Sequence, residues 1–352
     1  MQTKSRRWTW VGSGAVLWAV AAAGQYVTPA RVSWTEDSAT TATITWDTAN
    51  AARGTVRYGL TTNYTGTVHD GGGVHRHVVT LRGLQPSTRY FYEAAATDGY
   101  RQTASFRTAP AADAPLHFVL HGDLQGGLSN VWGQAVADRI TAEDPHWVQQ
   151  LGDLSDEAYS GAGFGTWAAF FQICSQELAQ AVFLPIPGNH DDPDNATDPD
   201  PARGLYHRLF TLPEPSLGLG FYAYTAGRIR FIGLSTEETA PVQTNWLAGE
   251  LQAAANDPNI IWIVPMLHRP PYSQGEREGW LEGKTNWCPL FVMYEADLVL
   301  GGHSHNYQRT VPVRGVRYLV TGGGGAYLYG SAVGEPLQAY ATTCYHHVSC
   351  HV

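Results

Sequence analysis

Five apolar runs in the C-terminal two thirds of the chain each end in a polar motif, and this arrangement restricts the fold more than any other feature. The motifs are Gly122-Asp123, Gly152-Asp153, Gly188-Asn189-His190, His268 and His303-Ser304-His305. In an open α/β sheet the C-terminal ends of the strands converge on one edge, where ligands bind. We therefore expect five loops to direct carboxylate, amide and imidazole groups toward one point.

Each motif alone is weak evidence, because Gly and Asp after a strand usually make ordinary turns. His303 and His305 carry more weight, since alternate residues of an extended segment point to the same side. Five motifs in one ordered series argue against coincidence.

The mixture of groups favours metal ions. Carboxylates and imidazoles without thiolates suit Zn, Mn or Fe. Two ions about 3.5–4 Å apart can share a bridging carboxylate and a bridging hydroxide, which is a nucleophile at neutral pH. They also neutralise charge on a transferring phosphoryl group. The pattern therefore predicts a two-metal site that hydrolyses phosphate esters.

Two composition regimes meet near residue 110. Residues 26–109 contain short runs of alternating apolar and polar residues, such as 41–46, 77–81 and 90–94, with turn residues between them. This pattern is typical of a β-sandwich. Residues 109–115 predict a linker. In residues 110–352 strand-like runs alternate with helical segments, such as 130–141 and 165–181, which indicates an α/β domain.

Both parts of the chain, residues 26–109 and 110–352, resemble known families. Residues 81–92 resemble the tyrosine-corner region of fibronectin type III domains. The five motifs resemble the calcineurin-like metallophosphoesterases, most closely the purple acid phosphatases, over nearly all of residues 115–330. The resemblance implies a four-layer α/β sandwich preceded by an all-β fibronectin III-like sandwich. It also implies an acid phosphatase-like hydrolase that cleaves phosphate monoesters by direct attack of a metal-bridging hydroxide, without a phosphoenzyme.

The resemblance also implies roles for single residues. The implied metal ligands are Asp123 and His305 on the first ion, Asp153 as the bridge, and Asn189, His268 and His303 on the second ion. His190 lies just outside the metals in this scheme and acts as the general acid on the leaving oxygen. Asn189 and His190 would both contact the substrate.

One position departs from the family pattern. Purple acid phosphatases carry a tyrosine three residues after the bridging aspartate, where it binds ferric iron, and this chain has Asp156 there. We therefore expect the tyrosinate colour to be lacking. Two alternatives stay open: Asp156 ligates a metal directly, or Gln125 takes the position that a histidine holds in other branches. Fe, Zn and Mn are all candidate ions.

Further residues near the motifs carry less weight. Arg269 and Tyr307 are candidate contacts for the substrate. Structural ion pairing of Arg269 and core packing of Tyr307 are the alternatives. The glycine run at residues 322–325 lacks the Lys-Ser/Thr of a phosphate-binding loop, so it predicts a tight backbone turn beside the site.

The N-terminus predicts export. Basic residues at positions 4, 6 and 7 precede a charge-free stretch of 16 residues, which is short for a membrane span, and small residues follow at 21–24. Residues 1–25 are thus a signal peptide or an anchor, and a cleaved signal would leave no stable membrane insertion. The expected location is the periplasm, the cell surface or the extracellular space.

Composition limits the partners. The net charge of −9 provides no basic field for a nucleic-acid polymer. It does not exclude a small phosphate-ester substrate, because bound cations can dominate the local charge. The sequence does not indicate an oligomeric state.

The C-terminus of the chain has a strand-like pattern, and two other functions fit parts of the sequence. The chain stops at Val352 inside a strand-like run, whereas family members continue, so we expect truncation with an unpaired sheet edge. One alternative function is a phosphodiesterase acting on nucleotides or lipid headgroups. The other is a surface-binding protein with an idle metal site, against which the nearly complete ligand set argues.

Overall fold

The computed structural model describes residues 20–21, 25–126, 130–156, 164–191, 205–213, 220–237, 241–330 and 336–352. The predicted signal peptide lies almost wholly outside these residues, apart from β1 (Val20–Ala21), which pairs with β2 (Gln25–Tyr26). Among the described helices, none is both long and apolar enough to cross a membrane.

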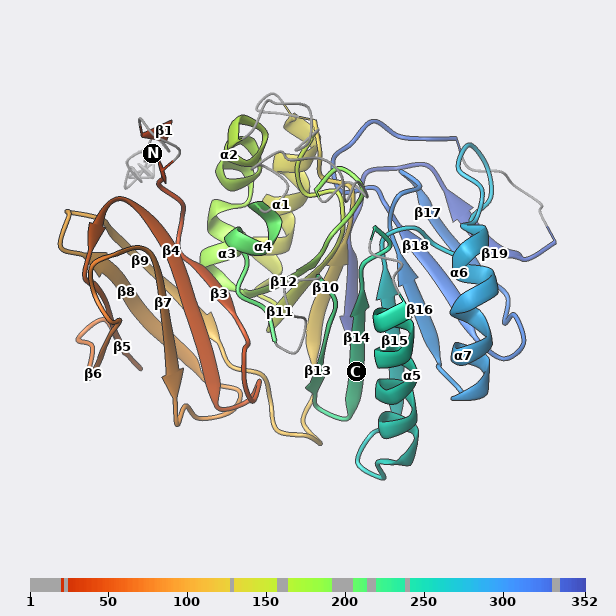
Figure 1. Ribbon diagram of the computed structural model, residues 1–352, viewed down its shortest axis with the longest axis horizontal. Coiled ribbons are helices and arrows are strands. Elements are labelled where there is room, and N and C mark those ends of the chain that lie inside the picture. The colour runs from red at the N-terminus through yellow and green to blue at the C-terminus, as the bar shows by residue number, and fades with distance from the viewer. Residues whose placement is uncertain are drawn as a thin grey trace, which may run out of the picture.

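Two antiparallel sheets form the N-terminal sandwich, shown in red to orange in Figure 1. One contains β3 (Arg31–Ser33), β4 (Thr41–Ala52) and β7 (Val74–Arg82), and the other contains β6 (Gly66–His69), β5 (Gly54–Gly59), β8 (Arg89–Ala96) and β9 (Arg101–Arg107). Alternation along the strands buries Trp46, Val56 and Phe106 in the core. The Tyr90 hydroxyl accepts a hydrogen bond from the Gln85 backbone at 2.9 Å, as expected of a tyrosine corner. The predicted all-β domain is confirmed.

The α/β domain contains two sheets that face each other (Figure 1). The first runs β20-β10-β11-β12 and continues into β3-β4-β7, with β10 (His117–His121), β11 (Trp147–Leu151) and β12 (Val182–Ile186) parallel. The second runs β13 (Tyr222–Ala226), β14 (Ile229–Leu234), β15 (Trp262–Leu267), β16 (Leu298–Gly301), β18 (Arg317–Thr321), β17 (Tyr307–Thr310) and β19 (Gln338–Thr342). The strands from β14 to β18 in this order are parallel, so their C-terminal ends share one edge.

Helices form the two outer layers. Against the first sheet pack α1 (Val131–Glu143), α2 (Phe164–Ile173), α3 (Ser175–Gln180) and α4 (Leu205–Leu209), and against the second pack α5 (Pro241–Asn256), α6 (Leu281–Asn286) and α7 (Cys288–Met293). Between the sheets Phe118 stacks on Trp147 at 4.5 Å and meets Phe231 edge-on at 5.5 Å. The predicted four layers are confirmed. The helix expected at 165–181 is two helices, because the backbone at Cys174 (φ −92°, ψ 8°) leaves the α-helical region.

The sandwich and the α/β domain share a sheet. Strand β3 pairs in parallel with β12 through Val32 and Val182. Across the junction Trp34 packs on Trp147 at 5.5 Å between ring centroids, and Tyr92 donates to the Ala179 carbonyl at 2.9 Å. The first residue of the predicted linker, Ala109, is buried. The sandwich therefore extends the sheet that carries part of the site.

The last strand, β20 (Val348–His351), lies on the opposite edge of the first sheet. It pairs antiparallel with β10, and Leu116 and Val352 exchange backbone hydrogen bonds of 2.9 and 3.0 Å. The strand-like run at the end of the sequence is thus a paired strand.

Candidate metal centre

The parallel strands bring the five predicted motifs to one edge of the two sheets. Asp123 follows β10 and Asp153 follows β11, while His303 follows β16. These three residues have positive φ angles of 61°, 56° and 65°. A left-handed conformation costs a residue with a side chain about 1–2 kcal/mol. Such strain persists where the surroundings impose it, and it concentrates at functional sites.

The first group of metal-ligand atoms comes from Asp123, Asp153 and His305. One donor atom from each lies within 4.8 Å of the others, and all three side chains are buried. His305 Nε2 is 3.4 Å from Asp123 Oδ1. The Asp123 carboxylate also accepts the backbone N–H of His303 at 2.9 and 3.0 Å. A carboxylate pair with one imidazole matches the ligands expected for the first ion.

The second group consists of Asp153, His268 and His303, again with donor atoms within 4.8 Å. His268 Nε2 lies 3.2 Å from Asp153 Oδ2, 3.2 Å from Asn189 Oδ1 and 3.3 Å from His303 Nδ1. Asp153 belongs to both groups. The donor set therefore fits two cations that share one carboxylate, which is the arrangement of two-metal hydrolases.

Backbone carbonyls select the tautomers of two histidines. His268 Nδ1 donates to the Leu151 carbonyl at 2.9 Å, and His305 Nδ1 donates to the Tyr327 carbonyl at 2.7 Å. In both rings Nε2 is then the nitrogen with a lone pair, and it points to the carboxylates. Metal-binding histidines usually have such a partner on the other nitrogen.

The electrostatics also suit cations. Burial opposes charge on His268, yet Asp153 raises the pKa of His268 to about 9. Burial lowers the pKa of His303 to about 2, with help from the positive charges of His268, Arg269 and Arg277. Burial opposes ionisation of Asp153, but His268 and His190 hold its pKa below the usual value. A metal ion that binds such groups takes the place of a proton.

Two loops of the site are tied together by Asp191, which was not among the predicted site residues. Its fully buried carboxylate accepts backbone N–H groups from Leu154 and Ser155 at 2.9–3.1 Å and from Gly188 at 3.0 Å. The first two residues follow Asp153, and the third precedes Asn189. The sequence signal was its position directly after Asn189-His190.

The two candidates for an additional metal ligand, Gln125 and Asp156, differ in their distance from the site. Gln125 is buried, and its amide nitrogen is 3.2 Å from both Asp153 Oδ2 and His305 Nε2. Asp156 is partly exposed and belongs to neither group of ligand atoms found among the described residues. Of the two, only Gln125 reaches the donor atoms of the described site.

His190 stands beside both groups. Its backbone N–H donates to Asp153 Oδ1 at 2.9 Å, and its ring Nε2 is 4.0 Å from Asp153 Oδ2. A quarter of its side chain is exposed. It is therefore next to the carboxylate that belongs to both groups, and it is partly exposed.

The two candidate substrate contacts have structural partners. Arg269 forms an ion pair with the buried Glu237, with Nε 2.9 Å from Oε1. Tyr307 packs edge-on against Tyr340 and His346 at 5.9 and 5.5 Å. Ion pairing and packing, the alternatives considered for these residues, are both observed.

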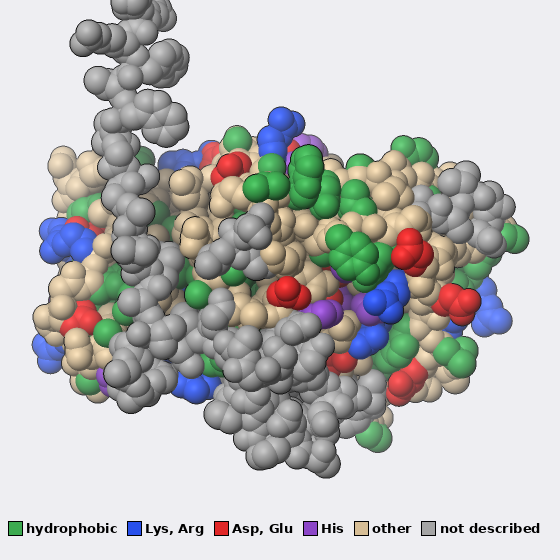
Figure 2. Space-filling view, turned by 90° about the horizontal axis from the view of Figure 1, so that it is seen from above, with side chains coloured by type: hydrophobic (Ala, Val, Ile, Leu, Met, Phe, Trp, Pro, Cys, Tyr) green, Lys and Arg blue, Asp and Glu red, His purple; other side chains and the backbone are tan. Residues whose placement is uncertain are grey.

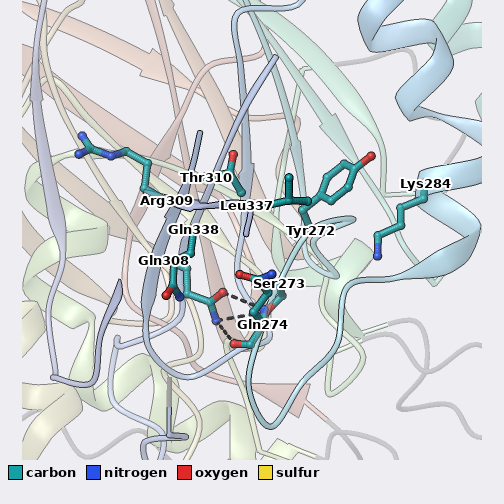
Figure 3. A pocket seen from close by; sticks show the side chains of 9 residues that line it. All are labelled: Tyr272, Ser273, Gln274, Lys284, Gln308, Arg309, Thr310, Leu337 and Gln338. Carbon is teal, nitrogen blue, oxygen red and sulfur yellow. Dashed lines mark hydrogen bonds between the residues drawn. The ribbon is translucent and has the colours of Figure 1, made fainter. Parts of the chain in front are cut away.

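The surface around the site is mixed in charge. Figure 2 shows histidine side chains exposed beside Lys or Arg, Asp or Glu, and hydrophobic side chains. A separate cavity of about 140 Å³ lies between α6, β17 and the segment after β15, and Figure 3 shows its lining. None of the predicted metal ligands lines this cavity.

Comparisons with known proteins agree with this architecture. Residues 116–307, more than half of the chain, match the family model of calcineurin-like phosphoesterases, and residues 27–108 match that of the purple acid phosphatase N-terminal domain. A purple acid phosphatase from yellow lupin (Lupinus luteus) seeds superposes with a TM-score of 0.77 at 18% identity, covering 92% of this chain and 69% of that one. At this identity the likeness concerns the fold.

Curated relatives share the same regions. An uncharacterized protein of Mycobacterium tuberculosis is 28% identical over 278 residues, which is 68% of this chain and 51% of that protein. Acid phosphatase type 7 of Homo sapiens is 28% identical over 276 residues, with coverages of 69% and 60%. The chain thus spans about half to three fifths of these relatives. With both family models matched in order, the chain belongs to the calcineurin-like phosphoesterases and carries a purple acid phosphatase-type N-terminal domain.

Proposed function

We propose that this protein is a two-metal phosphatase that hydrolyses small phosphate monoesters. The observation that supports the proposal most is the membership of Asp153 in both groups of ligand atoms. A shared carboxylate places two cations next to each other, as the two-metal mechanism of phosphoester hydrolysis requires. The relatives named acid phosphatase favour the same reaction class.

The described residues divide into two binding sets. Asp123, Asp153 and His305 would hold one cation, while Asp153, His268, His303 and Asn189 would hold the other. Bound cations would lower the pKa of a water molecule and neutralise charge on the phosphate. Fe, Zn and Mn all suit this donor set.

His190 is the proposed general acid. Its ring is accessible, and its Nε2 lies 4.0 Å from Asp153 Oδ2. From that position it would donate a proton to the leaving oxygen as the ester bond breaks. The Asn189 amide, 3.2 Å from His268 Nε2, would contact the same phosphate or ion.

The decisive experiment is metal reconstitution with an ester panel. Metal-free protein is loaded with Mn, Zn or Fe, and the bound metal is counted. We expect about two ions per chain and faster hydrolysis of monoesters than of diesters. Faster hydrolysis of diesters would instead identify a phosphodiesterase, and loaded protein without turnover would indicate an idle site.

The bridge is tested by Asp153→Ala with Asp156→Ala as the matched control. Asp153→Ala should lower kcat/KM about 1,000-fold or more and reduce the bound metal, because both ions lose a ligand. Asp156→Ala should keep two ions and near-normal turnover, since Asp156 lies outside both groups. Near-normal activity of Asp153→Ala, with thermal unfolding still cooperative in both variants, contradicts the bridging role.

We also infer export, on the basis of the basic and apolar N-terminal residues. A cleavage site near residue 24, found by N-terminal sequencing of the mature protein, would support this location. Full-length protein retained inside the cell would contradict it.

A further inference from the structure

An arginine outside the predicted site is oriented at its rim. Arg277 lies in the segment between β15 and α6 and is exposed. Its guanidinium stands 5.2 Å from the ring centroid of Tyr329, and its Nη2 donates to the Tyr329 hydroxyl at 3.3 Å. The Tyr329 ring stacks on His305 at 4.1 Å with an interplanar angle of 7°. Two contacts therefore connect Arg277 to a candidate metal ligand.

Arg269 has a carboxylate partner that neutralises its charge, whereas Arg277 has none among the described residues. Both arginines lie close to the site, because Arg269 directly follows His268 and Arg277 contacts the Tyr329 ring that stacks on His305. Arg269 is neutralised by Glu237 at 2.9 Å. Within the described part of the chain no carboxylate forms an ion pair with Arg277, and the adjacent Glu276 instead accepts the Gly330 N–H at 2.7 Å. Arg277 is thus the rim cation that can accept an anionic partner.

The segment that carries Arg277 is held in place. The side chain of Gln308 on β17 accepts the Gln274 N–H at 2.9 Å and donates to the Gln274 carbonyl at 2.8 Å, as the dashed lines in Figure 3 show. On the other side Glu276 fixes the backbone at Gly330. An arginine on such a braced segment loses less conformational freedom when it binds a ligand than an ordinary surface arginine.

Given the proposed function, on which this inference rests, we propose that Arg277 selects phosphate esters that carry a second anionic group on the leaving group. The planar guanidinium fork matches a carboxylate or a phosphate with two parallel hydrogen bonds. The scissile phosphate would occupy the metal site, and the second anion would reach the rim. Substrates with a single phosphate and a neutral leaving group would make no use of Arg277.

The test uses phosphonates as competitive inhibitors of the metal-loaded protein. Methylphosphonate carries one anionic group, phosphonoacetate adds a carboxylate, and methylenediphosphonate adds a second phosphonate. The inhibition constant of each is measured for the wild type and for Arg277→Gln, Arg277→Lys and Arg82→Gln. Arg82 is an exposed sandwich arginine paired with Glu36, so its variant controls for lost surface charge.

We expect the wild type to bind at least one two-anion inhibitor more tightly than methylphosphonate. Arg277→Gln should reduce that preference about 5- to 10-fold, the size of an exposed charge-assisted hydrogen bond, and leave methylphosphonate unchanged. Arg277→Lys should restore part of it. The inhibitor whose binding weakens more in Arg277→Gln shows whether the second anion of the substrate is a carboxylate, as in phosphonoacetate, or a phosphate, as in methylenediphosphonate.

Three outcomes overturn the inference. The wild type has no preference for a second anion, Arg277→Gln weakens all three inhibitors equally, or Arg82→Gln has the same effect as Arg277→Gln. Failure of the proposed function would differ from all of these. An idle site would give no ester turnover in the metal-loaded wild type, and a phosphodiesterase would hydrolyse diesters faster than monoesters in the ester panel.

Discussion

The two sheets of the α/β domain supply different chemistry to one site. The loops of the first sheet present the carboxylates of Asp123 and Asp153, whereas the loops of the second present only imidazoles among the candidate ligands. Backbone N–H groups orient the carboxylates. Backbone carbonyls orient the imidazoles of His268 and His305. Each kind of ligand therefore has a backbone partner of opposite polarity.

The partners often come from the opposite sheet. The His303 N–H of the second sheet donates a hydrogen bond to Asp123 of the first. The Leu151 carbonyl of the first sheet accepts a hydrogen bond from His268 Nδ1 of the second. Neither sheet holds all of its own ligands in place by itself. The geometry of the site thus depends on how the sheets pack, through buried aromatics such as Trp147 and Phe231 at 5.6 Å.

After Asp153→Ala, the largest effect is expected from His190→Ala, which removes the candidate general acid from the loops of the first sheet. Turnover of esters with poor leaving groups should fall about 100- to 1,000-fold, because a general acid contributes this much, and good leaving groups should be affected much less. The measurement is kcat against leaving-group pKa, with the exposed His69→Ala as control. Equal slowing across the series would rule out the acid role.

A smaller effect is expected from Asp191→Asn on the same side. An amide cannot accept all the N–H groups from Leu154, Ser155 and Gly188 that the carboxylate accepts, so the loops of Asp153 and Asn189 should loosen. Metal affinity, measured by chelator competition, should fall about 10- to 100-fold, as for other groups that orient ligands. Asp138→Asn, on the exposed face of α1, is the control. Unchanged metal affinity with a lower melting temperature would mean that Asp191 supports only the fold.

The smallest effect is expected from Tyr329→Leu, which lies beside the imidazole ligands of the second sheet. This change removes the ring stacked on His305 while leaving the Tyr327 carbonyl in place. An aromatic pair contributes about 0.5–1.5 kcal/mol, so metal should bind roughly 2- to 10-fold more weakly. Tyr329→Phe keeps the ring and should bind metal normally. If Phe and Leu behave alike, the stacking does not position His305.

The fold was largely predictable because the spacing of apolar residues and the turn residues between strands are local properties of the sequence. The alternation at residues 41–46 predicted β4, and the apolar runs before Gly122 and Gly152 predicted β10 and β11. The break at Cys174 and the pairing of β3 with β12 were not predictable. The first depends on a single backbone angle pair, and the second joins Val32 to Val182 across 150 residues of chain.

The sequence by itself determined which groups gather at the sheet edge, because strand direction alone sends every motif there. Only the tertiary structure decided the finer distinctions: Gln125 rather than Asp156 beside the ligand atoms, Arg269 paired with Glu237, and Arg277 turned toward Tyr329. These distinctions depend on contacts of a few ångströms between loops from different strands. Such distances follow from sheet packing and long-range hydrogen bonds, which no local pattern of residues encodes.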